Sequence, residues 1–127
     1  MRKPAAPRDI PPPLELECLK VLWQLGEGSV KDVRSSLAES RDLAYTTVMT
    51  LMDRLVKKGS ASRRKSGRMF LYAPLLPRDH ARRLAVQELV DTFFGGSRED
   101  LRVFLEGQPA RAVAAQPQTE ELDTALL

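Results

Sequence analysis

The stretch that decides the fold lies between residues 44 and 74 and reads AYTTVMTLMDRLVKKGSASRRKSGRMFLYAP. Its first half predicts a helix from about Tyr45 to Lys58, because four apolar side chains recur at helical spacing and Gly59 follows the last turn. The four residues of this inward stripe are Val48, Leu51, Met52 and Leu55. We therefore expect an amphipathic helix whose opposite face is open to solvent.

The second half of the stretch predicts a β-hairpin. Aromatic residues alternate around Leu71, and a turn at Ser66-Gly67 separates two short extended arms. Ser60 and Ala61 are poor strand formers, so we expect the first arm to be short or frayed.

Two helices are expected before this stretch. The first covers about residues 14–25, where apolar side chains repeat at helical spacing until two glycines interrupt the pattern. The second covers about residues 30–39, because Ser29 can cap its N-terminus and Asp32 favours the positive end of the helix dipole.

Two more helices are expected after the hairpin. A long one starts near Pro77 and ends at Gly95-Gly96, and a short one opens at Ser97 and runs to about Leu105. Three helices followed by a hairpin form the winged variant of helix-turn-helix, in which the third helix enters the major groove and the hairpin tip reaches the backbone or minor groove. The predicted fold class is therefore mainly α with a small β-hairpin, a winged helix-turn-helix followed by two C-terminal dimerisation helices.

The domain organisation follows from this order and from composition. Five of the nine prolines fall within the first 13 residues, where their fixed φ and missing N–H groups oppose regular structure. From Gly107 the chain is mostly Ala, Gln, Pro and acidic residues, a composition typical of disorder. We predict a flexible Pro-rich arm at 1–13, a winged-helix DNA-binding domain at 14–76, a helical dimerisation module at 77–106 and a disordered tail at 107–127.

Composition excludes several classes of function. Cys18 and His80 are the only cysteine and histidine, which excludes disulfide frameworks and four-ligand zinc sites and favours a reducing, cytoplasmic compartment. Neither a signal peptide nor a membrane span is expected, since no apolar run is long enough. There is no nucleophile-and-base cluster and no phosphate-binding glycine loop. We therefore predict no enzymatic activity, no catalytic residue, no metal, no cofactor and no small-molecule substrate.

Positive charge is concentrated on the predicted third helix and hairpin. The whole chain carries +3, but the window from Arg41 to Tyr72 holds eight basic and two acidic residues and therefore +6. A phosphate-binding surface needs such a concentration, because neutralised phosphates release counterions and supply affinity. An isolated basic run would be interpreted as a solvated face; its coincidence with a helix-turn-helix pattern favours DNA binding.

The third helix and the hairpin supply the candidate DNA contacts. Threonine can reach base edges or phosphates, although the first two threonines could instead cap the helix. We assign Lys57 to phosphate and leave Arg54 open between guanine and phosphate. Asp53 also faces outward and would repel phosphate unless it pairs with Arg54, with Lys57 or with a cytosine amine. The candidate DNA-binding residues are Tyr45, Thr46, Thr47, Met49, Thr50, Arg54, Lys57, Arg63, Arg64, Lys65 and Arg68.

The two final helices carry more apolar surface than a compact winged helix can easily hide. A two-fold partner would cover it and would match a palindromic operator, with one recognition helix in each half-site. The alternative is that these helices pack back on the first helix within a monomer. The candidate dimerisation residues are Leu84, Leu89, Val90, Phe93, Phe94, Leu101, Phe104 and Leu105.

The chain resembles the penicillinase-repressor family, which includes the methicillin-resistance regulator and copper-responsive repressors (BlaI/MecI/CopY). The resemblance runs from about Leu14 to Phe104 through the segments LELECLKVLWQLGEGSVKDVRSSL, AYTTVMTLMDRLVKKG, SGRMFLYAPL and FFGGS. It implies a bacterial winged-helix repressor, dimeric through its C-terminal helices, that binds an inverted-repeat operator. It also implies DNA contacts on the third helix at Thr46, Thr47, Met49, Thr50 and Arg54, beside the basic residues of the hairpin.

The chain departs from the family pattern at three places. Several members have Lys and Arg where Thr46 and Met49 stand, so a different operator sequence is expected. The copper branch has a C-terminal cysteine cluster, whereas no cysteine follows Cys18. In the β-lactam branch a membrane-linked protease pathway cuts an Asn-Phe bond, and the corresponding residues here are Val103-Phe104.

Two functional hypotheses follow. The first is a homodimeric, sequence-specific transcriptional repressor on a palindromic promoter operator, released by an unidentified signal, with a membrane sensor protease as the candidate relay. The second is a winged-helix module that binds protein or RNA without operator specificity. The regulated genes, the operator bases and the signal do not follow from the sequence.

Overall fold

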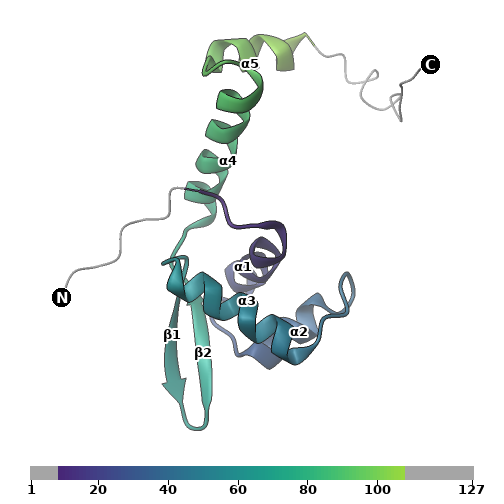
Figure 1. Cartoon of the computed structure of the whole chain (residues 1–127), viewed down its shortest axis with the longest axis vertical. Coiled ribbons are helices and arrows are strands. Elements are labelled where there is room, and N and C mark those ends of the chain that lie inside the picture. The colour runs from purple at the N-terminus through teal and green to yellow at the C-terminus, as the bar shows by residue number, and fades with distance from the viewer. Residues whose placement is uncertain (1–8, 108–127) are drawn as a thin grey trace, which may run out of the picture. The chain divides into compact units, whose positions relative to one another are not determined.

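The computed structural model describes residues 9–107. Within this range the chain forms five helices and one two-stranded sheet, in the order expected from the sequence. The elements are α1 (Pro13–Leu25), α2 (Val30–Leu37), α3 (Tyr45–Lys57), β1 (Ala61–Ser66), β2 (Met69–Pro74), α4 (Arg78–Phe93) and α5 (Arg98–Glu106). The predicted fold class, mainly helical with a β-hairpin wing and C-terminal helices, is confirmed (Figure 1). None of the helices in this range is long and apolar enough to cross a membrane.

The chain divides into two compact units, residues 1–86 and residues 87–127. The first unit therefore contains α1 to β2 and the start of α4. The predicted arm and tail fall largely on residues 1–8 and 108–127, which lie outside the described residues. The domain assignments remain predictions.

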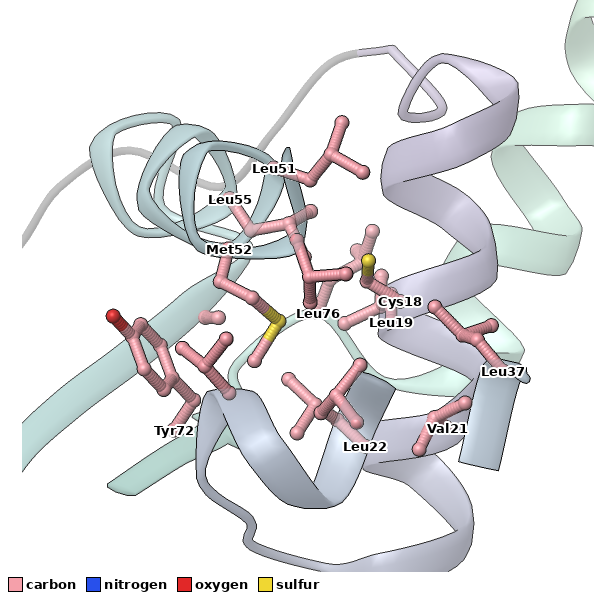
Figure 2. Packing of buried hydrophobic residues seen from close by; sticks show 14 of the residues in the cluster. Cys18, Leu19, Val21, Leu22, Leu37, Leu51, Met52, Leu55, Tyr72 and Leu76 are labelled. Carbon is pink, nitrogen blue, oxygen red and sulfur yellow. The ribbon is translucent and has the colours of Figure 1, made fainter. Parts of the chain in front are cut away.

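The core of the first unit lies between α1, α2 and α3. The predicted stripe of α3 is buried in full, and Figure 2 shows Leu51, Met52 and Leu55 turned toward Cys18 and Leu19 of α1. Burying these side chains removes apolar surface from water, the main favourable contribution to folding. The opposite face of α3 is thereby left to solvent.

A capping box fixes the start of α2. The Ser29 hydroxyl accepts from the Asp32 backbone N–H at 3.1 Å, and the Asp32 carboxylate accepts from the Ser29 N–H at 3.0 Å. These bonds satisfy backbone donors that have no partner inside the helix, and they lower the pKa of Asp32. The predicted capping role of Ser29 is confirmed.

The wing is an antiparallel pair in which Ser66 faces Met69 and Ala61 faces Pro74. Its two-residue loop is Gly67 and Arg68, one position later than the predicted turn, with Gly67 at φ +64°. A positive φ of this kind favours glycine because it has no Cβ. In Figure 1 the wing projects beyond the three helices of its unit.

The expectation of a short or frayed first strand is wrong. Strand β1 has six residues, as many as β2, and Ala61 is buried. The Ser60 carbonyl accepts from the backbone N–H groups of Leu75 and Leu76 at 2.8 and 3.0 Å. Burial and these bonds outweigh the weak strand propensity of Ser60 and Ala61.

One further strand-like contact was not expected from the sequence. Gly28, between α1 and α2, exchanges two backbone hydrogen bonds with Tyr72 of β2, at 2.9 and 2.8 Å. This bridge attaches the wing to the loop that precedes α2. The wing is therefore anchored to the helical body by backbone bonds as well as by the core.

Candidate nucleic-acid interface

The outward face of α3 is the centre of the candidate interface. Every residue predicted there as a DNA contact is exposed, including Tyr45 at the start of the helix. These residues are Tyr45, Thr46, Thr47, Met49, Thr50, Arg54 and Lys57. Three hydroxyl-bearing threonines and two cations therefore share one solvent-facing side of the helix.

The N-terminus of α3 has no side-chain cap. Its N-cap residue is Ala44, which has no side-chain oxygen to bond the first backbone N–H groups. The alternative in which Thr46 or Thr47 caps this helix is thus not realised. The first N–H groups of α3 lie beside these two threonines, and together with the helix dipole they favour an anion at this end.

Asp53, the acidic residue on this face, connects α3 to the wing. Its Oδ1 accepts from the Tyr72 hydroxyl at 3.0 Å and from Arg63 Nη1 at 3.3 Å. The sequence predicts Arg54, Lys57 or a cytosine amine as the partner of Asp53. The prediction of Arg54 or Lys57 is wrong, because the carboxylate bonds to Arg63 and Tyr72 instead. Burial raises the pKa of Tyr72, and the bond that its hydroxyl donates to Asp53 raises it as well.

The two arginines of β1 point to opposite sides of the wing, as successive residues of a strand must. On the Asp53 side the Arg63 guanidinium also lies over the Phe70 ring, 4.3 Å from its centroid. On the other side Arg64 makes two bonds to the Glu27 carboxylate, at 2.7 and 2.9 Å. This fork holds the pKa of Glu27 below its usual range and raises that of Arg64.

These contacts correct one expectation about the hairpin. The crowded basic residues were expected to need an external anion to relieve their repulsion, but Asp53 and Glu27 already neutralise two of them. Across residues 9–107, Lys65 and Arg68 of the wing and Arg54 and Lys57 of α3 make no ion pair. These four side chains of α3 and the wing can therefore meet an anion without first leaving a carboxylate of the chain.

The predicted dimerisation residues divide into exposed and buried groups. Leu89, Phe93, Phe104 and Leu105 are exposed, and Phe93 is the most open at 72% of its full accessible area. The neighbouring Val103, which is not among the predicted dimerisation residues, is also exposed.

The remaining four are covered within the chain. Val90 is fully buried, Phe94 and Leu101 are half-buried, and Leu84 packs against the core of the first unit. The Phe94 and Phe104 rings contact each other inside the second unit, with centroids 5.5 Å apart. Val90 has no exposed surface to offer a partner, because other residues of the chain cover it.

The described residues contain no group of three or more His, Cys, Asp and Glu side chains that could hold a metal ion. Cys18 is fully buried, as expected for a small hydrophobic residue, and burial raises the pKa of its thiol to about 11. Neither observation adds a reactive group to the candidate interface.

Comparison with known families identifies the chain. The family model described as penicillinase repressor matches residues 12–124. The chain belongs to the penicillinase repressor family. Members of this family are DNA-binding transcriptional repressors, which is the class of function that the sequence predicts.

Three relatives illustrate the similarity. The chain is 39% identical over 88 residues to the transcriptional regulator BlaI of Mycobacterium tuberculosis, covering 68% of this chain and 64% of that protein. It is 28% identical over 93 residues to the penicillinase repressor of Bacillus licheniformis, covering 72% and 73%. A 16.5 kDa protein of Latilactobacillus sakei is 36% identical over 81 residues, which is 64% of this chain and 56% of that protein. The chain thus spans little more than half the length of the last relative.

Solved structures of the penicillinase repressor family are also similar. The DNA-binding domain of the repressor BlaI has a TM-score of 0.49 at 28% identity, covering 62% of this chain and 90% of that one. Monomeric BlaI of Bacillus licheniformis in complex with the blaP half-operator has a TM-score of 0.48 at 31% identity, covering 57% and 90%.

Proposed function

We propose that this chain represses transcription by inserting α3 into the major groove of an operator while the tip of the wing contacts the DNA backbone. One observation carries the proposal: the exposed face of a helix-turn-helix unit presents four cations that no carboxylate of the described residues neutralises. Such cations gain most from phosphate, because binding releases counterions from the DNA without breaking a protein ion pair. Membership of the penicillinase repressor family supports the same function.

The contacts divide into positioning and reading groups. Lys57, Lys65 and Arg68 hold phosphates, and the threonines and Met49 meet base edges in the groove. Arg54 lies on the same exposed face and either forks onto a guanine or holds a phosphate. Tyr45, Thr46 and Thr47 surround the uncapped start of α3, where a backbone phosphate also fits.

Arg63 and Arg64 take a different part in the proposal. Each is bonded to a carboxylate of its own chain, so phosphate must compete with that carboxylate for the guanidinium. We therefore assign both arginines to holding the wing in place beside α3. Their contribution to DNA affinity is indirect.

The proposed functional form is a homodimer on an inverted-repeat operator. The exposed apolar side chains of the second unit supply a surface that a two-fold partner would cover. Two copies then present two α3 helices to two half-sites. The proposal places this dimer in the bacterial cytoplasm, where a signal releases it from DNA, with a membrane sensor protease as the candidate relay.

Cleavage at Val103-Phe104 is not part of this proposal. The bond lacks the Asn-Phe sequence cut in the β-lactam branch, and it lies inside helix α5 rather than in an extended segment. An inducing signal must therefore act by another route or at another bond.

Binding to genomic DNA fragments across a salt series tests the proposed function. A repressor should select fragments with an inverted repeat. Three phosphate-binding cations per protomer, or four if Arg54 also holds a phosphate, predict a log-log salt slope of about −3 to −4 per half-site. Weak binding to every fragment with no preferred site would contradict operator recognition. That result would favour the alternative module that binds protein or RNA.

Arg54→Ala separates the two roles left open for this residue. If Arg54 reads a guanine, the variant loses discrimination at one base pair, worth about 1–3 kcal/mol, while its affinity for other fragments changes little. If Arg54 holds a phosphate, affinity falls alike on all fragments. Selection of operator fragments from a randomised pool with both proteins distinguishes the two results.

A further inference from the structure

A cavity of about 370 Å³ opens in the first unit, and no residue of α3 or of the wing lines it. Its walls come from α1, from the first turns of α4 and from Ile10. Leu16, Trp23 and Ala81 supply much of an apolar floor. The volume lies within the range of sites that enclose small molecules.

Trp23 forms a fixed wall of this cavity. Its indole Nε1 donates to the Leu76 carbonyl oxygen at 2.8 Å, which holds the ring in one orientation. The guanidinium of Arg78 lies 5.6 Å from the centre of the ring. The apolar surface of the cavity is thus preformed, so ligand binding loses little free energy in ordering these side chains.

The charged residues that line the cavity are all basic: Lys20, Arg78 and Arg82. Lys20 is bonded to Glu17 at 3.3 Å and Arg82 to Asp79 at 3.2 Å, and both pairs are open to solvent. Each of these is a single contact between neighbours on one helix turn and is screened by water, unlike the two-bond fork between Arg64 and Glu27, so a ligand anion can compete with the carboxylate for the cation. Arg78 makes no ion pair within residues 9–107.

We propose that this cavity binds a small amphipathic carboxylate. The apolar body of the ligand lies against Leu16, Trp23 and Ala81, and its carboxylate meets the three cations at the rim. Arginine suits this role, because its planar fork matches the geometry of a carboxylate. An alcohol of the same chain length lacks the anion, and an amine carries the wrong charge.

The experiment uses the full chain and the fluorescence of Trp23, the single tryptophan of the sequence. Octanoate is the probe, with octan-1-ol and octylamine as matched compounds of other charge. Octanoate should give a saturable change in emission, while the alcohol and the amine should bind about tenfold more weakly or not at all. Equal binding of octanol and octanoate would overturn the anion site, and so would no saturable response to octanoate.

Two variants locate the site without removing any core side chain. The double change Lys20→Gln and Arg82→Gln removes two rim charges at exposed positions and should weaken octanoate binding about tenfold or more. Ala85→Phe, on the exposed lining of α4, should fill the cavity and abolish the response. The matched control, Lys31→Gln with Arg83→Gln, changes the same charge at exposed positions outside the cavity and should bind octanoate as the parent does. Octanoate binding that survives both site variants would overturn the proposal.

Discussion

At the scale of single residues, an acidic side chain organises the basic surface. Asp53 lies on the outward face of α3, where a free carboxylate would repel DNA. Its Oδ1 instead accepts hydrogen bonds from Tyr72 and Arg63. The same arrangement withdraws Arg63 from the surface available to phosphate. Some cations of the hairpin hold the wing in place and others are free to bind phosphate. Which role each one takes depends on whether a carboxylate lies next to it, and not on how many basic residues the hairpin has.

That division predicts different effects for two neighbouring residues of β1. Lys65→Ala should weaken binding to all DNA fragments alike and reduce the log-log salt slope by about 1, because one phosphate contact is lost. Arg64→Ala should leave the slope nearly unchanged, because Arg64 is already paired with Glu27. Fluorescence anisotropy of a labelled operator across a salt series gives both slopes. Equal losses of slope in the two variants would show that Arg64 leaves Glu27 for phosphate.

Cys18 predicts a specific dependence of stability on pH. Its thiol has a pKa of about 11 in the folded chain, raised by burial from an ordinary value of 9.0. Well below pH 9.0 both states hold the proton, so the stabilising effect is complete there. As the pH rises through this value the unfolded thiol ionises first, and about 1 kcal/mol of unfolding free energy should be lost by pH 10.

Urea unfolding at pH 7 and pH 10 measures this loss. Cys18→Ala provides the control, since it removes the thiol while every other titrating group remains. The variant is less stable at pH 7 because it leaves a cavity, but its stability should fall less between the two pH values than that of the parent. An equal fall in both proteins would contradict the role given to the thiol.

At the scale of helices and strands, one ion pair ties α1 to the end of α3. Glu15, in the first turn of α1, is almost fully buried, and its carboxylate accepts from Lys58 Nζ at 2.9 Å. Lys58 is the C-cap residue of α3, and its ammonium is half exposed. The pair therefore joins the first helix to the residue at which the recognition helix ends.

Removing only the lysine should be costlier than removing both partners. Lys58→Met leaves a buried carboxylate without its counter-charge, and we expect a loss of about 1–2 kcal/mol in unfolding free energy, moderated by the exposure of Lys58. Adding Glu15→Gln removes the unpaired charge and should recover part of the loss. Lys57→Met, at the exposed and unpaired neighbour, should change stability by less than about 0.5 kcal/mol.

Urea unfolding of the parent and the variants measures these differences, provided that the dependence of the unfolding free energy on urea concentration is the same in all of them. If the double variant is no more stable than Lys58→Met alone, the buried charge is not the source of the loss.

A helix or strand could be predicted from the sequence where the spacing of its apolar side chains alone determines which of them are buried. The stripe of Val48, Leu51, Met52 and Leu55 is buried as expected, since helical spacing alone determines which side chains share a face. The bonds of Arg63 to Asp53 and of Arg64 to Glu27 could not be predicted. They join residues 10 and 37 positions apart, and they depend on the register of the wing and on its docking to the helices.

Two other expectations were wrong or incomplete for a related reason. Low strand propensity at Ser60 and Ala61 predicted a frayed arm, but both residues are buried by neighbours that local propensity does not include. Helical spacing selected Val90 as dimer surface, yet the chain itself covers it. Propensity and period describe a segment alone, whereas burial depends on what packs against it.

At the scale of the whole molecule, the proposed dimer joins the second unit to DNA recognition. Phe93 and Phe104 are exposed aromatic side chains of α4 and α5, and leaving such area in water is unfavourable unless a partner covers it. Changing both to Asp places two charges in the proposed apolar dimer interface, where burying them is unfavourable. We expect Phe93→Asp with Phe104→Asp to give a monomer in sedimentation velocity, while the circular dichroism of the winged helix is retained.

The same double variant separates dimerisation from DNA binding. A monomer keeps α3, the wing and their four unpaired cations, so it should still bind a half-site, but with one protomer's salt slope and without the gain that two linked half-sites provide. Thr92→Asp is the matched control, because it adds a charge at an exposed polar position of α4 and should leave the mass and the operator affinity unchanged. A double variant that sediments with the mass of the parent would refute the proposed dimer interface. A monomer that binds the full operator as tightly as the parent would instead show that dimerisation is not needed for recognition.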